Sequence, residues 1–115
     1  MKKIVYSKVL RSKLKKLKQD LIDRFGEKTS VETLTKIMKE LHLLADNCEL
    51  GVSISELYTI DTEYYYLFSS HNYFIYRIEA DSVVIVNMFN EKEDFMLKLF
   101  GVSGRTQESI DYWGE

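Results

Sequence analysis

The first third of the chain has apolar residues at helical spacing. After the short run Lys3–Tyr6 (KIVY), which predicts a strand, leucines and a phenylalanine recur at steps of three and four residues. These positions are Leu10, Leu14, Leu17, Leu21 and Phe25. Ser7 is suited to cap the start of this helix, and Gly26 is suited to end it. The pattern therefore predicts a strand followed by an amphipathic helix.

A second apolar stripe lies between Val31 and Cys48 and ends before Gly51. Its members are Val31, Leu34, Ile37, Met38, Leu41, Leu44, Ala45 and Cys48. The stretch Thr29–Glu32 has the form of a capping box, in which a hydroxyl residue is followed three positions later by a glutamate. Two amphipathic helices joined by a short connection are expected to pack as an antiparallel hairpin.

From Leu57 onward the apolar period changes to two, which is typical of strands. Four segments rich in β-branched and aromatic residues follow, at Leu57–Ile60, Tyr64–Ser69, Tyr73–Glu79 and Val83–Phe89. The last three are separated by turn residues and predict an antiparallel meander, and Phe95–Phe100 predicts a closing helix. The expected fold class is α+β in the order β-α-α-β-β-β-β-α, with an antiparallel sheet packed on an N-terminal helix hairpin. We expect one domain over residues 1–103 and a polar tail over 104–115.

Alternation along the last two strands predicts which side chains face the helix hairpin. The set expected to face it is Phe74, Tyr76, Ile78, Val84, Val86 and Met88. The set expected on the open face is Tyr73, Ile75, Arg77, Glu79, Val83, Ile85, Asn87 and Phe89. Four of these, Ile75, Val83, Ile85 and Phe89, would form an exposed apolar surface that calls for a partner or for self-association as a homo-oligomer.

The amino-acid composition bears on disulfides, membrane segments and metal sites. A single cysteine, Cys48, excludes an internal disulfide, and its place on the apolar stripe favours a core role. The basic N-terminus has no long apolar run, so neither a signal peptide nor a membrane span is predicted, and we expect a cytoplasmic protein. Two histidines and one cysteine, without a metal-binding spacing, predict no metal site and no cofactor.

The net charge of −2 hides an asymmetry. Residues 1–28 hold 10 Lys and Arg against 3 Asp and Glu, a net charge of +7, whereas residues 29–115 sum to −9. The basic end fits a nucleic acid, an acidic partner or simply a solvated helix face.

The order of these segments resembles the RelE/ParE family of bacterial type II toxin–antitoxin toxins, which includes plasmid stabilisation proteins. The resemblance covers Lys3 to Phe100. It is carried by IVYSKVLRSKLKKL, by RFGEKTSVETLTKIMKELHLLADNCELG and by YYYLFSSHNYFIYRIEADSVVIVNMFNEKED. It implies a compact growth inhibitor that is neutralised by a cognate antitoxin protein. Within the family, RelE-like members cut messenger RNA on the ribosome, and ParE-like members poison DNA gyrase.

RelE-like chemistry would need cations and acid–base groups gathered around the phosphate. The candidate catalytic residues are Arg77, Lys92 and Tyr73, with His71 and Lys98 as further candidates. Many relatives carry a His-Gly-Arg-Arg-Asp run before the closing helix, where this chain has Asn90-Glu91-Lys92-Glu93-Asp94. The glutamates would repel a phosphate, and the carboxylates of this run suit a helix start. For Arg77 the structural alternative is an ion pair with Glu79, and for Tyr73 it is cross-strand packing.

Whether the protein is an enzyme stays open at this point. The leading hypothesis is the toxin of a type II toxin–antitoxin system, with a gyrase target slightly favoured. The alternatives are a ribosome-dependent mRNA endoribonuclease that uses Arg77 and Lys92, and a non-toxic antitoxin-binding module on the same scaffold.

Overall fold

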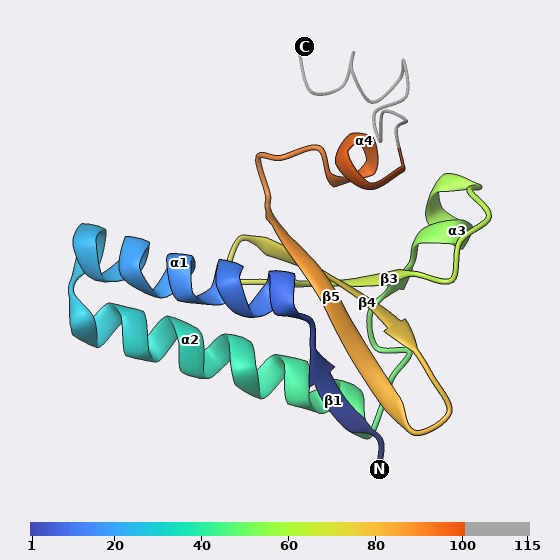
Figure 1. The fold of residues 1–115 in the computed structure, drawn as a ribbon, viewed down its shortest axis with the longest axis horizontal. Helices are drawn as coiled ribbons and strands as arrows, with labels where there is room; N and C mark the ends of the chain where they lie inside the picture. The colour runs from blue at the N-terminus through green and yellow to red at the C-terminus, as the bar shows by residue number, and fades with distance from the viewer. Residues whose placement is uncertain (101–115) are drawn as a thin grey trace.

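A computed structural model of the chain describes residues 1–100, and for Phe100 only the backbone (Figure 1). The helices and strands are β1 (Lys3–Tyr6), α1 (Lys8–Phe25), α2 (Glu27–His42), the 3-10 turn η1 (Leu43–Ala45), β2 (Val52–Ser53), α3 (Ile54–Tyr58), β3 (Tyr65–Ser69), β4 (Asn72–Ile78), β5 (Ser82–Asn90) and α4 (Phe95–Phe100). The predicted α+β class, the hairpin and the closing helix are confirmed. The tail predicted at 104–115 lies outside the described residues.

The five strands form one mixed sheet in the order β1-β5-β4-β3-β2. The pairs β2/β3, β3/β4 and β4/β5 are antiparallel, and the meander predicted for the last three strands is confirmed. Because β1 pairs in parallel with β5, the sheet is mixed and not fully antiparallel as predicted. The chain therefore returns to its own N-terminus when it forms β5. The strand predicted at Leu57–Ile60 is wrong, because Leu57 and Tyr58 belong to the short helix α3 and Thr59 and Ile60 lie in irregular chain.

The hairpin differs from the prediction at its turn. Gly26 ends α1 as expected, and α2 begins directly after it at Glu27. The capping box predicted at Thr29–Glu32 is therefore wrong, since these residues lie inside α2. Gly26 has a φ of 93°, which a residue with a side chain rarely adopts, and this conformation lets one residue join the two helices. The Ser30 hydroxyl is buried and donates to the Lys18 carbonyl 3.2 Å away, so it ties the two helices together.

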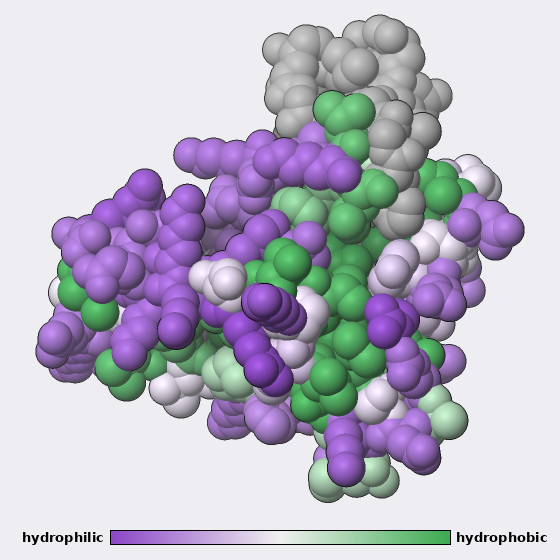
Figure 2. All heavy atoms as spheres, in the orientation of Figure 1, coloured by the Kyte–Doolittle hydropathy of each residue, from purple (hydrophilic) through white to green (hydrophobic). Residues whose placement is uncertain are grey.

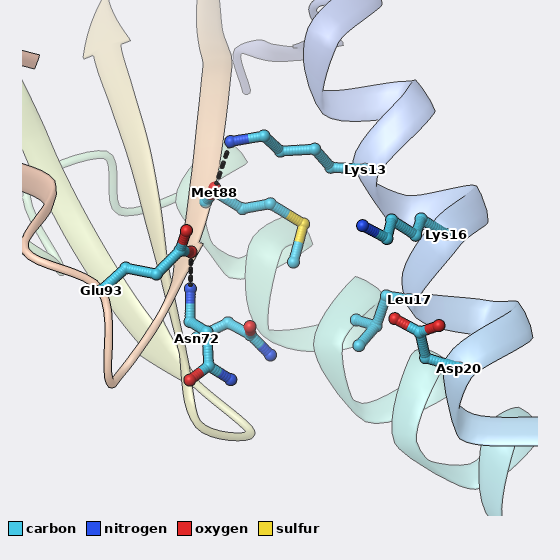
Figure 3. A pocket seen from close by; sticks show the side chains of 8 residues that line it. Lys13, Lys16, Leu17, Asp20, Asn72, Met88 and Glu93 are labelled. Carbon is cyan, nitrogen blue, oxygen red and sulfur yellow. Dashed lines mark hydrogen bonds between the residues drawn. The ribbon is translucent and has the colours of Figure 1, made fainter. Parts of the chain in front are cut away.

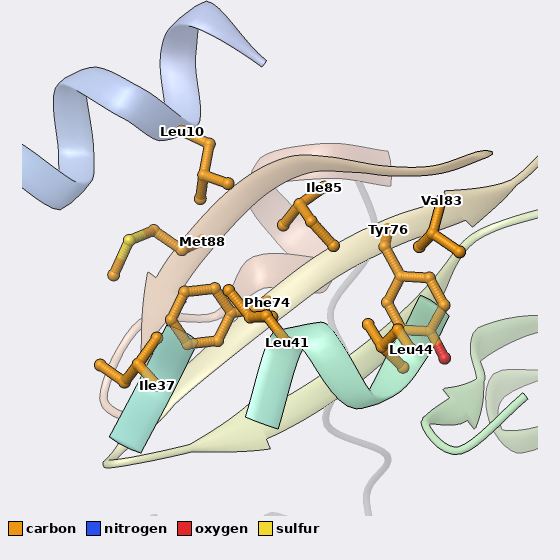
Figure 4. Packing of buried hydrophobic residues seen from close by; sticks show 9 residues of the cluster. All are labelled: Leu10, Ile37, Leu41, Leu44, Phe74, Tyr76, Val83, Ile85 and Met88. Carbon is orange, nitrogen blue, oxygen red and sulfur yellow. The ribbon is translucent and has the colours of Figure 1, made fainter. Parts of the chain in front are cut away.

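The main core lies between the helix hairpin and one sheet face (Figure 4). From the helical side it receives Leu10, Ile37, Leu41 and Leu44, and from the sheet it receives Phe74, Tyr76, Val83, Ile85 and Met88. The faces predicted for β4 are confirmed. For β5 they are confirmed at Met88 but wrong at Val84 and Val86, because Val83 and Ile85 face the hairpin instead.

A β-bulge in β5 explains this difference. Ile75 pairs with Asn87, but the next residue of β4, Tyr76, pairs with Ile85, so Val86 is an extra residue in β5. An extra residue reverses the alternation on one side of the bulge. As a result, Met88 and Ile85 point to the same face although they are three positions apart.

The second sheet face is also covered. The short helices α3 and α4 place Ile54, Phe95 and Met96 over Ile75 and Phe89, and these five residues form a second buried cluster. The exposed surface predicted from Ile75, Val83, Ile85 and Phe89 is therefore wrong, because all four side chains are buried. Among the described residues, no helix is both long enough and apolar enough to cross a membrane.

Candidate functional site

The residues proposed for RNA cleavage lie at different ends of the β4–β5 hairpin. Arg77 is opposite Val84, whereas Lys92 follows Asn90, which is opposite Asn72. Five positions of β4 separate Asn72 from Arg77, which corresponds to about 17 Å along a strand. Tyr73 is opposite Phe89 and so lies near the Asn90 end. The fold does not gather Arg77, Lys92 and Tyr73 at one point.

Arg77 already has an acidic partner. Its Nε lies 2.7 Å from the Glu79 carboxylate, and both side chains are partly exposed. The hydrogen bond to Glu79 raises the pKa of Arg77 above its ordinary value, with a smaller contribution from Tyr64. The ion pair considered as the structural alternative is therefore present, and it reduces the positive field that Arg77 offers to a phosphate.

Tyr73 lies in an aromatic cluster on the second sheet face. Its ring centroid lies 4.9 Å from that of Phe68, 5.0 Å from that of Phe95 and 5.2 Å from that of Tyr66. These are distances at which aromatic rings pack favourably. Tyr73 therefore has a cross-strand packing role, as the structural alternative expected.

The acidic run after β5 builds a turn and a helix start. The Asp94 carboxylate accepts from the Leu97 N–H at 3.1 Å, which is an N-cap for α4. The Glu93 carboxylate accepts from the Asn90 N–H at 2.8 Å and from the Lys98 ammonium at 2.6 Å. The helix-start interpretation of this run is confirmed.

His71 joins the same turn from the β3–β4 side. Its Nδ1 lies 3.1 Å from the Glu91 carboxylate, and its carbonyl accepts from the Glu91 N–H at 2.8 Å. Both side chains are exposed, so the contact is a surface pair that contributes little stability. The candidates His71 and Lys98 thus lie near the Lys92 end of the sheet, and each of them has a carboxylate partner.

A recessed polar groove lies between α1 and the end of β5 (Figure 3). It has a volume of about 280 Å³ and is lined by Lys13, Lys16, Leu17, Asp20, Asn72, Met88, Asn90 and Glu93. The groove therefore offers ammonium groups, carboxylates and amides beside the apolar side chains of Leu17 and Met88.

Lys13 contacts both the backbone and an aromatic ring of β5 at this groove. Its ammonium donates to the Met88 carbonyl at 2.9 Å and lies 4.1 Å from the centroid of the Phe89 ring. Burial lowers the pKa of Lys13, the nearby Lys98 ammonium lowers it further, and the Glu93 carboxylate opposes both. Burial raises the pKa of Glu93, but Lys98, the Asn90 N–H and Lys13 outweigh it, so that the pKa lies below its ordinary value.

The sequence pattern does not predict this groove, because the periodicity of α1 does not show how the helix packs against β5. A signal was nevertheless present. Lys13 lies three positions after Leu10 and four before Leu17, so it flanks the buried stripe and its stem can reach the sheet.

The similarity of this chain to known proteins is found in its structure and not in its sequence. No protein-family model matches the sequence, and no curated protein sequence matches it. A chain of the solved structure "Chromosomal ParDE TA system from P. aeruginosa" superposes with a TM-score of 0.65 at 10% sequence identity, over 78% of this chain and 96% of that chain. This chain therefore shares its fold with one chain of that solved structure. The predicted RelE/ParE-like fold is therefore confirmed, and at this identity the likeness concerns the fold alone.

Proposed function

We propose that the protein is the toxin of a type II toxin–antitoxin system and inhibits growth until a cognate antitoxin binds it. The observation that carries this proposal is the match over 96% of a chain from a ParDE system. The sequence motifs resemble the same family, although the two chains are only 10% identical. Pattern and fold therefore support the same class of protein.

For the target, we propose DNA gyrase rather than messenger RNA. RNA cleavage needs fixed cations aimed at the negative charge of the transition state. Here Arg77 is paired with Glu79, and Lys92 lies about one strand length away beside three carboxylates. Both features argue against a nuclease centre, and neither bears on the inhibition of a protein target.

The test is induced expression in a bacterial host, with and without the gene beside this one. Growth is scored, plasmid supercoiling is measured as a readout of gyrase, and message ends are mapped on ribosomes. We expect growth arrest and loss of negative supercoiling, both relieved by the neighbouring gene, with no new message ends. Arg77→Ala should leave the arrest intact, and Arg24→Ala is the matched control because it removes another arginine from the surface.

Other outcomes separate the alternatives. New message ends that disappear in Arg77→Ala or Lys92→Ala would identify a nuclease and contradict the gyrase proposal. Normal growth, together with tight binding of the neighbouring gene product, would identify a non-toxic binding module.

A further inference from the structure

The charged side chains of residues 1–19 are all basic. These residues contain eight lysines and arginines and no aspartate or glutamate, and the first carboxylate is Asp20. The eight are Lys2, Lys3, Lys8, Arg11, Lys13, Lys15, Lys16 and Lys18. Because the protein as a whole has a net charge of −2, this segment is a local feature.

Four of these cations form a stripe along α1. Lys8, Arg11, Lys15 and Lys18 are all exposed and follow each other at steps of three, four and three residues. This spacing places them on one side of the helix over a length of about 15 Å. The buried Leu10 and the partly buried Leu14 and Leu17 lie on a different side, and the surface over the hairpin is mostly hydrophilic in Figure 2. We call these four residues the basic stripe.

The stability of the fold does not explain the basic stripe. Cations near a helix N-terminus oppose the helix dipole, and the first turn of α1 has no acidic residue to offset them. Like charges three or four positions apart also repel each other. Within residues 1–100 the ion pairs are His71–Glu91, Arg77–Glu79 and Lys98–Glu93, and none of them involves the stripe. Local rules broken in this way are typical of functional surfaces.

The composition of the stripe indicates the kind of partner. Lysine is depleted in protein–protein interfaces, which rely on aromatic and apolar anchors. A phosphate backbone needs no such anchor and is bound through lysine and arginine. Residues 8–19 contain no aromatic side chain on which the bases of a single strand could stack, so a duplex is favoured.

The shape of the element favours DNA over RNA. An α-helix with its side chains is about 10–12 Å across. The major groove of B-DNA is about 12 Å wide and accepts such a helix, whereas the major groove of A-form RNA is deep and narrow. We propose that the basic stripe of α1 docks on the phosphate backbone of duplex DNA without reading its sequence. This inference goes beyond the proposed function, which requires no contact between this chain and DNA.

The experiment is fluorescence anisotropy with a labelled 20-base-pair duplex DNA of arbitrary sequence, in NaCl from 50 to 200 mM. If the four cations each contact a phosphate, affinity should fall about 100-fold over this range, since each contact contributes a slope of about −0.9. In the quadruple variant Lys8→Gln/Arg11→Gln/Lys15→Gln/Lys18→Gln, most of this salt dependence should disappear. Circular dichroism verifies that the variant is folded.

The matched control neutralises four other exposed cations, in Arg24→Gln/Lys28→Gln/Lys36→Gln/Lys39→Gln. It changes the net charge equally and should keep the salt dependence of the wild type. If both variants lost the same amount of salt dependence, net charge alone would explain DNA binding, and the proposal would be overturned. Absence of binding at 50 mM salt would overturn it as well.

Two competing ligands complete the test. A duplex RNA of the same length and a poly-glutamate peptide of the same charge are titrated under the same conditions. Tighter binding of either than of the DNA would overturn the assignment to DNA. Because these assays measure neither growth nor the antitoxin, their failure would leave the proposed toxin function standing.

Discussion

The Tyr76 side chain belongs to the main core and also hydrogen-bonds to the backbone of a nearby irregular segment. Its ring is fully buried in the main core, yet its hydroxyl donates to the Cys48 carbonyl at 2.9 Å and accepts from the Gly51 N–H at 3.0 Å. The irregular segment between η1 and β2 is thereby attached to the centre of the sheet. Gly51 is required there, because a Cβ at this position would lie 2.6 Å from the Tyr76 hydroxyl.

Tyr76→Phe should therefore lower the free energy of unfolding by roughly 1–3 kcal/mol, the cost of leaving two partly buried backbone groups without a partner. The difference from the wild type should depend on pH. Burial raises the pKa of Tyr76 to about 12 from an ordinary value of 10.0. Since the folded-state pKa is the higher one, this stabilisation is fully present below pH 10 and is lost as the pH rises through about 12.

The measurement is urea unfolding of both proteins at several values between pH 8 and pH 11.5. The stability of the wild type should approach that of the variant at the alkaline end. A difference in unfolding free energy between the two proteins that does not change with pH would contradict the raised pKa of the Tyr76 hydroxyl.

At the scale of elements, the start of α1 is tied to β5 at the bulge. The Ser7 hydroxyl accepts from the Leu10 N–H at 3.0 Å and donates to the carbonyl of Val86, the extra residue of β5, at 2.6 Å. The Ser7 N–H donates to the Ile85 carbonyl at 3.0 Å. The bulge thus presents a carbonyl that fixes where the helix begins.

Ser7→Ala should cost about 1–2 kcal/mol of unfolding free energy, because a helix cap and a partly buried hydrogen bond are lost together. Ser12→Ala is the control, since Ser12 is exposed on the same helix and alanine is the better helix former there. Thermal unfolding of the two variants should show a lower midpoint for Ser7→Ala alone. Equal midpoints would contradict the role of the bulge.

The same elements show what could be predicted from sequence. The leucine stripe of α1, its serine cap and the faces of β4 were visible because their periodicity is unambiguous. The run Val83–Val86 is apolar on both faces, so alternation could not reveal a bulge that depends on pairing with β4. The capping box predicted at Thr29–Glu32 does not form, because the backbone conformation of Gly26 allows α2 to begin earlier, at Glu27. In the candidate site the helix start at Asp94 was local and predictable, whereas the groove at Lys13 depends on how α1 packs against β5.

At the scale of the whole molecule, one sheet separates two apolar clusters of unequal size. The hairpin supplies one cover, and the short helices α3 and α4 supply the other. Leu41 belongs to the larger cluster and is fully buried, whereas Leu43, two positions later, is 51% exposed.

Leu41→Ala should lower the unfolding free energy by about 2–5 kcal/mol, through lost burial and the cavity that remains. Leu43→Ala removes the same atoms from a half-exposed site and should cost much less. Denaturant unfolding of both variants gives the comparison. Similar losses of unfolding free energy in the two variants would contradict a main core between the hairpin and the sheet.

The parallel pairing of β1 with β5 has a consequence for the timing of synthesis. Ser7 and Val86, which join the start of α1 to β5, are 79 positions apart in the chain. At roughly 5–20 residues per second, translation would separate their appearance by about 4–16 seconds. During that interval β1 has no neighbour, and the groove beside Lys13 lacks its β5 wall. The start of α1 therefore lacks its β5 partner until residue 86 has been made, so the five-stranded sheet and this groove can form only after most of residues 1–100 have been synthesised.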